Sequence, residues 1–167
     1  MGTYNLAIIT KKIYNSGLLL FHTKTLKDIL GTKKQSTLFS VIKKLVNAGI
    51  LTRIGKNKYL LEDSNIKDFS IANFIYNSSY ISFESALNFY GILSQFPYEI
   101  SSATNRKTVK KYFHDKIFTY VHIQKKLFWG YEKKDGFIIA HPEKAILDQL
   151  YLSSKGYNFL KAEQPYV

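Results

Sequence analysis

The sequence of 167 residues contains no cysteine, a single tryptophan and three prolines. The absence of cysteine excludes disulfide bonds, thiolate zinc sites and a cysteine nucleophile. No apolar run approaches the ~18 residues that a membrane-spanning helix needs. The N-terminus also lacks a basic region followed by an apolar stretch, which would mark a secretory signal. We therefore expect a cytoplasmic, globular protein with no membrane partner.

Acidic residues are scarce in the first 61 positions, where Asp28 stands alone against ten lysines and Arg53. The net charge of this segment is 11 − 1 = +10, out of +12 for the whole chain. The remaining residues carry 13 basic and 11 acidic side chains, a net charge of +2. A basic excess confined to one end of a chain indicates a polyanion-binding module joined to a second part.

Apolar spacing in the basic segment predicts three helices and three short strands. In order, they are a helix over 4–16, a strand over 18–22, a helix that Thr25 opens with Asp28 in a capping-box-like pattern, a helix over 36–48, and strands over 50–54 and 59–61 joined by a turn at 55–58. This is the order of elements in a winged helix-turn-helix. In that geometry the third helix enters the major groove of DNA.

The predicted third helix has an apolar stripe on one face and no acid on the other. Solvated helix faces usually mix both signs of charge, so a face of short polar side chains and lysines indicates contact with phosphates. We expect Gln35, Ser36, Thr37 and Ser40 to meet base edges, and Lys33, Lys34, Lys43, Lys44 and the wing residues Arg53, Lys56, Asn57 and Lys58 to meet the flanking backbone. The expected partner is double-stranded DNA, with RNA or a protein as the alternative.

The second segment predicts an α+β domain, because helices bracket its strands. We place the domain boundary at the polar stretch near Glu62, giving a winged helix-turn-helix over 1–62 and a mixed α/β domain over 63–167. The predicted elements are helices over 69–76, after the N-cap Ser82, and from Pro142, with strands over 98–104, 117–123, 125–131 and 137–140.

This half of the chain shows no enzyme signature. It has no glycine-rich phosphate loop, no nucleophile elbow and no paired nuclease carboxylates. His114, His122 and His141 lack metal-ligand spacing and are expected to be surface or half-buried imidazoles. Lys144 and Asp148, four residues apart, are expected to form a surface ion pair. We expect no enzyme, no metal and no cofactor.

Two segments resemble the AbiEi family of abortive-infection antitoxins. Residues 80–91 (YISFESALNFYG) are similar to a "YIS…SAL…hGL" segment that follows the family's winged helix, and residues 140–148 (AHPEKAILD) are similar to its "AdPEKAllD" helix start. Thr104 and Arg106 fit a polar strand end between the two. The resemblance covers roughly residues 5–155. His141 departs from the family pattern, which usually has Asp there.

The resemblance implies an antitoxin of a type IV toxin–antitoxin system, of which many act in phage defence. Its winged helix would repress its own operon by binding inverted repeats in the promoter. Its second domain would counteract a nucleotidyltransferase-like toxin, without requiring a stable complex. The family residues that carry over to this function are Tyr80, Ser82, Ser85, Glu143, Lys144 and Asp148.

Family members continue with further helices after this segment, so we expect a second domain truncated at its C-terminus relative to the family. The alternatives are a stand-alone winged-helix regulator and a protein-docking module without antitoxin activity. A nuclease would need clustered acids, which the sequence lacks.

Overall fold

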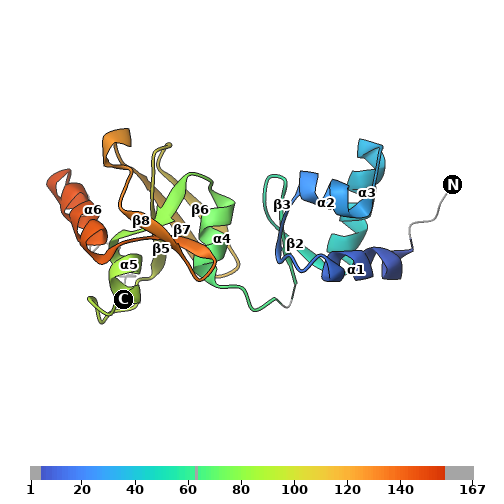
Figure 1. Cartoon of the computed structure of the whole chain (residues 1–167), viewed down its shortest axis with the longest axis horizontal. Coiled ribbons are helices and arrows are strands. Elements are labelled where there is room, and N and C mark those ends of the chain that lie inside the picture. The colour runs from blue at the N-terminus through green and yellow to red at the C-terminus, as the bar shows by residue number, and fades with distance from the viewer. Residues whose placement is uncertain (1–4, 63, 157–167) are drawn as a thin grey trace, which may run out of the picture. The chain divides into compact units, whose positions relative to one another are not determined.

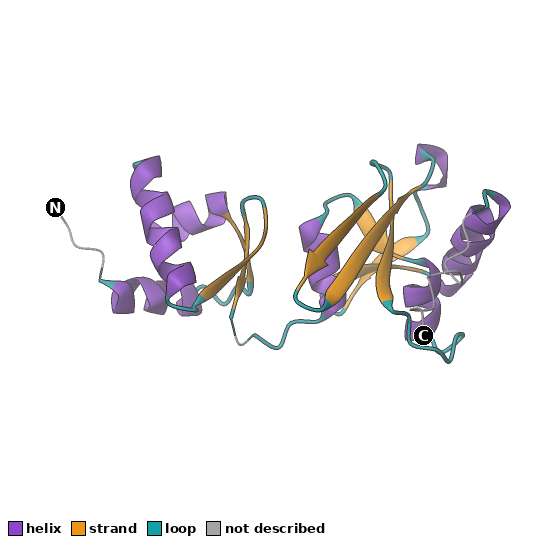
Figure 2. Ribbon diagram, turned by 180° about the vertical axis from the view of Figure 1, so that it is seen from behind, coloured by secondary structure: helices purple, strands orange, loops and turns teal. Residues whose placement is uncertain are grey.

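The chain is described from a computed structural model over residues 5–62 and 64–156 (Figures 1 and 2). It divides into two compact units, Met1–Lys67 and Asp68–Val167. The fold is mixed α+β. Within the described residues no helix is both long and apolar enough to cross a bilayer.

The N-terminal unit packs three helices against a small antiparallel sheet. Its elements are α1 (Leu6–Asn15), β1 (Leu20–His22), α2 (Thr23–Leu30), α3 (Gln35–Asn47), β2 (Leu51–Gly55) and β3 (Lys58–Leu61). The strand order is β1-β3-β2, so the first strand pairs with the last. One core joins the helices to the sheet, formed by Ile9, Ile13, Phe21, Leu26, Leu30, Leu38, Val41, Ile42, Leu45, Leu51, Tyr59 and Leu61.

The start of α2 differs from the sequence prediction. The helix begins at Thr23, directly after β1, and Thr25 lies inside it, so the predicted capping box with Asp28 is wrong. The N-cap position is His22, whose side chain makes no capping hydrogen bond. Instead, the Thr23 amide donates to the Asn57 carbonyl oxygen at 3.1 Å, which ties the start of α2 to the β2–β3 turn.

The described part of the C-terminal unit, residues 68–156, is a six-stranded mixed sheet with three α-helices. Its elements are α4 (Asp68–Ile75), β4 (Ser79–Ile81), α5 (Phe83–Phe89), β5 (Glu99–Thr104), β6 (Val109–Phe113), β7 (Lys116–His122), the 3₁₀ turn η1 (Lys125–Leu127), β8 (Tyr131–Lys134), β9 (Phe137–Ala140) and α6 (Pro142–Ser154). The order is β6-β7-β5-β4-β9-β8, which makes β6 and β8 the edge strands. The pairs β5–β7 and β4–β9 are parallel and the others antiparallel.

Several predicted elements of this unit need correction. The strand predicted over 125–131 is wrong, since η1 occupies its start and β8 begins only at Tyr131. Strands β4 and β6 were not predicted. Asp135 and Gly136 form the tight hairpin turn between β8 and β9, and both have the positive φ (51° and 88°) that such a turn requires.

Candidate nucleic-acid interface and a buried polar network

The exposed face of α3 carries the polar side chains that the sequence pattern placed opposite its core stripe. Leu38, Val41, Ile42 and Leu45 are buried, and the side chains on the other side of the helix remain in solvent. Among the predicted DNA-binding residues, Lys33, Lys34, Gln35, Ser36, Ser40, Lys43 and Lys44 are exposed, and Thr37 is half-buried. Lys34 occupies the N-cap position without a side-chain capping bond.

The predicted wing residues lie on the β2–β3 hairpin. Lys56 and Asn57 form its exposed turn, where Asn57 has a φ of 59°. Arg53 is exposed on β2, and its Nε donates to the Gly55 carbonyl oxygen at 3.2 Å. Lys58 begins β3 and is half-buried. The α2 start and this turn are joined through the Asn57 carbonyl, so the hairpin is anchored to the helices at its tip.

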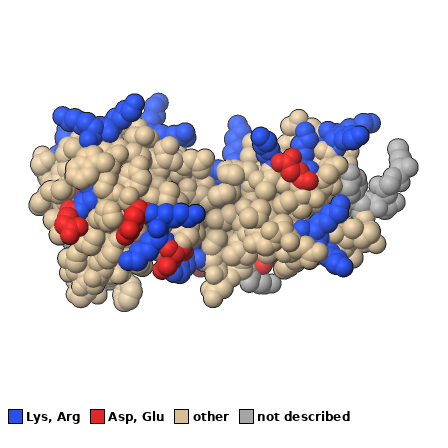
Figure 3. Space-filling view, in the orientation of Figure 1, with Lys and Arg blue, Asp and Glu red and all other residues tan. Residues whose placement is uncertain are grey.

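Five exposed lysines of α3, the turn before it and the β2–β3 turn have no carboxylate partner among the described residues. They are Lys33, Lys34, Lys43, Lys44 and Lys56. On the face drawn in Figure 3, groups of blue Lys and Arg side chains surround few red acidic ones on this unit. Unpaired lysines on a helix and a neighbouring hairpin are typical of a surface that binds a polyanion.

His22 experiences the same positive potential. Burial lowers its pKa, and the nearby charge of Lys58 lowers it further. Because β1 pairs with β3 so that His22 lies opposite Lys58, the two side chains belong to one strand pair. A neutral His22 is therefore favoured in the folded state.

Phe39 is a candidate contact residue that the sequence pattern did not predict. This residue lies on α3 between the polar face and the core stripe, and 44% of it is exposed. A helix advances 100° per residue, which places Phe39 about 60° from Ser36 and directly beside the polar face. The sequence feature that could have identified Phe39 is its position outside the apolar stripe formed by residues 38, 41, 42 and 45.

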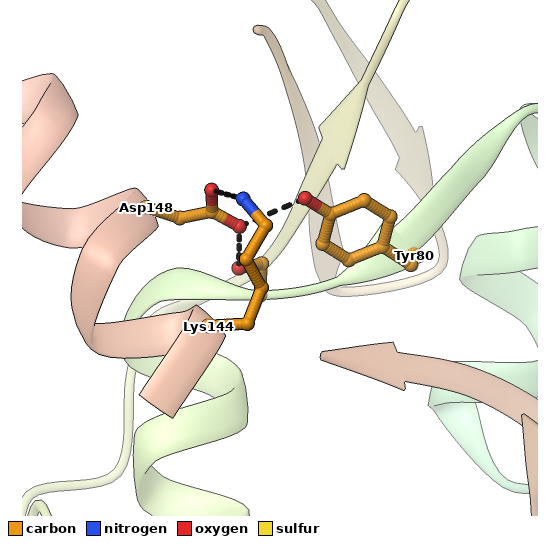
Figure 4. A network of polar contacts seen from close by, with 4 residues as sticks. Tyr80, Lys144 and Asp148 are labelled. Atoms are coloured by element: carbon orange, nitrogen blue, oxygen red, sulfur yellow. Dashed lines mark hydrogen bonds and ion pairs between the residues drawn. The ribbon is translucent and has the colours of Figure 1, made fainter. Parts of the chain in front are cut away.

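A second cluster, which we call the Asp148 network, lies buried in the C-terminal unit (Figure 4). The Asp148 carboxylate accepts hydrogen bonds from the Tyr80 hydroxyl at 2.9 Å and the Ser82 hydroxyl at 2.7 Å, and pairs with the Lys144 ammonium. Tyr80 and Asp148 are 68 residues apart in the chain. The network thus joins the two segments that carry the antitoxin resemblance.

The Lys144–Asp148 pair is not on the surface, and the prediction of a surface ion pair is wrong. The Lys144 and Asp148 side chains are only 4% and 2% exposed. Burial strips water from both charges, so the pair depends on good geometry and on additional hydrogen bonds. Tyr80 and Ser82 supply those bonds. Burial, followed by the charge of Asp148, strongly raises the pKa of Tyr80, so its hydroxyl stays protonated and donates.

Ser82 was predicted to cap the following helix, α5, through its side chain, but the structure does not show this bond. It occupies the N-cap position of α5, but its side chain makes no capping hydrogen bond. Its hydroxyl donates to Asp148 instead. The carboxylate is charged, so this bond is stronger than a neutral bond would be.

Aromatic residues of the segment 128–131 cover the network. The Trp129 ring centroid lies 5.2 Å from the Lys144 Nζ, and Tyr131 stacks on Tyr80 at 4.6 Å. Gly130 has a φ of +74°, and a Cβ built there would lie 3.0 Å from the Lys144 Cγ. A glycine is therefore required where the chain passes over the lysine. Sequence reasoning missed both Trp129 and Gly130.

The other two residues taken from the resemblance lie outside this network. Ser85 is buried in a neighbouring group of hydroxyls, where it lies 3.1 Å from the Ser101 hydroxyl and its own hydroxyl donates to the Glu99 carbonyl oxygen at 3.2 Å. Glu143 is exposed in the first turn of α6. The structure brings together Tyr80, Ser82, Lys144 and Asp148, but not Ser85 or Glu143.

Glu84, in the first turn of α5, is half-buried, with its Oε1 atom shielded from solvent. Its Oε1 has no hydrogen-bond partner among the described residues. Burial raises the pKa of Glu84, and the negative charge of Glu99 raises it further. The folded state therefore favours a protonated Glu84 more than the unfolded state does.

No protein-family model and no curated protein sequence matches this chain. A relationship to the AbiEi antitoxins is therefore a proposal that rests on the two sequence segments alone.

Proposed function

We propose that the N-terminal unit is a winged helix-turn-helix that binds double-stranded DNA. The supporting observation is the acid-free, exposed face of α3, whose lysines have no carboxylate partner among the described residues. The element order α1-β1-α2-α3-β2-β3 and the antiparallel order β1-β3-β2 suit this assignment. In this proposal α3 is the recognition helix and the β2–β3 hairpin is the wing.

The contacts divide by chemistry. Gln35, Ser36 and Ser40 lie at the N-terminal part of α3, where a recognition helix meets base edges. The lysines at 33, 34, 43, 44, 56 and 58 and Arg53 would contact phosphates. Phe39, beside this face, would lie against a thymine methyl group, the apolar feature of the major groove.

The function proposed for the whole chain is a transcriptional repressor of its own operon and an antitoxin of a type IV toxin–antitoxin system. The convergence of Tyr80 and Ser82 with Lys144 and Asp148 supports the second part, because it joins the two segments of the antitoxin resemblance. Buried at this depth, these side chains would act by holding α6 against the sheet. A nucleotidyltransferase-like toxin would be counteracted through exposed residues that this arrangement positions.

DNA binding is tested by measuring affinity for a duplex that carries the chain's own promoter, across a series of salt concentrations. Engaging about six phosphates predicts a slope of log affinity against log salt near −5. Charge reversal at Lys43 and Lys44 is expected to weaken binding and reduce the slope. The matched control is Lys133→Glu, which makes the same change of charge per site on the exposed part of β8.

Two results would contradict the proposal. One is binding that does not respond to salt. The other is an equal loss of affinity per reversed charge in the α3 variants and the β8 control, which would show that only net charge matters.

A second candidate function is protein docking, favoured by an exposed apolar face on α6. Ile146, Leu147 and Leu150 are 41%, 51% and 60% exposed on the same helix. Co-purification of the chain with a nucleotidyltransferase-like toxin, lost in Leu147→Ser and Leu150→Ser while DNA binding persists, would support docking. Neutralisation of the toxin in cells by these same variants would instead support an antitoxin that needs no stable complex.

A further inference from the structure

An open pocket of about 460 Å³ lies in the C-terminal unit, lined by Asn105, Arg106, Lys107, Thr108 and His122. The first four residues form the loop between β5 and β6, and His122 ends β7. None of these residues belongs to the α3 face or to the Asp148 network. The residues proposed to bind DNA therefore give this pocket no role.

The topology of the sheet places this pocket at the carboxyl ends of two parallel strands. β5 and β7 run side by side in the same direction (Figure 1). The strand register places Thr104 opposite His122. The segments that follow these two strands leave the sheet at the same edge. In open sheets, ligands bind preferentially in the crevice outside the carboxyl ends of parallel strands.

Hydrogen bonds hold the β5–β6 loop in shape. The Thr104 hydroxyl accepts from the Arg106 amide at 3.1 Å, and the Thr108 hydroxyl accepts from the His122 amide at 3.0 Å. The Tyr76 hydroxyl, from the residue that follows α4, donates to the Lys107 carbonyl at 3.2 Å. The loop is therefore attached to β5, to β7 and to the segment after α4, and its side chains extend from a preorganised backbone.

The basic side chains of the pocket differ from their neighbours in lacking acidic partners. Lys110 pairs with Glu99 and Lys116 pairs with Asp68, so two lysines of the adjacent strands are neutralised. Arg106 and Lys107 form no ion pair with any described carboxylate. The charges of Arg106 and Lys107 are therefore available to bind an anion in the pocket.

His122 presents a defined edge to the pocket. Its Nδ1 lies 2.8 Å from the Arg106 carbonyl oxygen, which can only accept, so Nδ1 carries a hydrogen and donates. The remaining ring nitrogen, Nε2, is the one that can meet a ligand. The Thr108 hydroxyl, which accepts from the His122 amide, retains its own hydrogen to donate.

We propose that this pocket binds the phosphoryl group of a small phosphorylated molecule. The planar guanidinium of Arg106 matches the spacing of two phosphate oxygens, and Lys107 adds a point charge. The amide of Asn105 and the hydroxyl of Thr108 supply neutral donors. The pocket is open and its five lining residues are all exposed, so a group attached to the phosphate would extend into solvent.

The site is tested by titrating the nitrogen-15-labelled full chain with pyrophosphate and following the backbone amide resonances by NMR. The expected result is a saturable shift centred on residues 105–108 and 122. Arg106→Gln is expected to weaken binding at least about tenfold, and Arg106→Lys, which keeps the charge but loses the planar fork, by an intermediate factor. Lys133→Gln, an equal loss of charge on β8, should leave the affinity unchanged.

Two further ligands distinguish the source of the phosphoryl group. Adenosine monophosphate that shifts the same amides more strongly than pyrophosphate would identify a nucleotide. A short DNA duplex that shifts these amides, while pyrophosphate and the nucleotide do not, would overturn the proposal. The absence of any saturable shift with pyrophosphate, or an unchanged affinity in a folded Arg106→Gln variant, would overturn it as well.

Because the pocket and α3 lie in different units, DNA binding can fail while the pocket binds, and the reverse. The amide resonances of α3 and of the β5–β6 loop report the two sites separately within one titration.

Discussion

Replacing Lys144 by Met tests whether the Asp148 network stabilises the C-terminal unit. Met keeps an unbranched side chain of similar length and removes the charge. The Asp148 carboxylate would stay buried with only the hydroxyls of Tyr80 and Ser82 as donors. Removing one partner of a buried ion pair costs about 3–5 kcal/mol. Since the stability of a domain is about 5–15 kcal/mol, this loss takes a large share of it.

Urea unfolding followed by tryptophan fluorescence measures this loss directly. Trp129 is the only tryptophan in the chain, and its ring lies 5.2 Å from the Lys144 Nζ, so the signal comes from the C-terminal unit alone. Lys116→Met is the matched control, because it breaks the pair with Asp68 in which the lysine and aspartate side chains are 51% and 37% exposed. Exposed pairs contribute below about 1 kcal/mol.

The double variant Lys144→Met, Asp148→Leu separates the ion pair from the packing around it. Removing both charges leaves no uncompensated buried charge, so the double variant should lose less stability than the two single variants added together. The hydroxyls of Tyr80 and Ser82 would then lack their acceptor, at a cost of about 1–3 kcal/mol each if no other partner is found.

A cost for Lys144→Met below about 1 kcal/mol, equal to that of Lys116→Met, would refute the reasoning. It would mean that water screens the pair and that the network does not hold α6 in place.

Two further predictions concern glycine geometry and pH. Gly130→Ala should destabilise the C-terminal unit by about 1–3 kcal/mol in the same assay, because the left-handed backbone and the contact with Lys144 both resist a Cβ, and an unchanged midpoint would contradict this. Glu84 has a raised pKa, so its contribution to stability is present below the ordinary value of 4.5 and is lost as the pH rises through the folded-state pKa. Glu84→Gln should therefore raise the melting temperature near neutral pH, and the gain over the parent protein should vanish below pH 4. A constant difference across that range would be inconsistent with titration of Glu84, and Glu143→Gln, at an exposed position, serves as the control.

Local patterns predicted α3 well because its signal is contained within one helix. The residues 38, 41, 42 and 45 repeat with helical spacing, and all four are buried. The order of helices and strands in the basic segment was also readable, because glycine and polar turns separate the apolar runs. The start of α2 was misplaced by two residues, since β1 ends directly at the helix without a turn between them.

The buried network could not be predicted from local spacing. Lys144 and Asp148 are four residues apart, and this spacing is the same for a pair in water and a pair in a core. Burial comes from Tyr80 and Trp129, which reach the pair through the tertiary fold. The three-residue strand β4 is likewise defined by its neighbours β5 and β9, because it is too short to carry a periodic pattern of its own.

The pocket at the β5–β6 loop could not be predicted either, because it also depends on contacts between elements that are distant in the sequence. The segment 107–116 contains four lysines, with Asp115 inside it and Glu99 shortly before it, and the sequence does not show which of the lysines form ion pairs. The fold neutralises Lys110 and Lys116 and leaves Arg106 and Lys107 without carboxylate partners among the described residues. Ion pairing between elements, rather than charge along the chain, therefore decides where a basic surface is available.

Lysines on the two edge strands of the six-stranded sheet have a consequence for aggregation. An edge strand presents unpaired backbone groups on which a strand of another molecule can form. Lys111 lies on the edge strand β6, and Lys133 and Lys134 lie on the edge strand β8. A second copy that approached either edge would bring like charges together. These lysines would thus keep the sheet from extending into aggregates at high protein concentration.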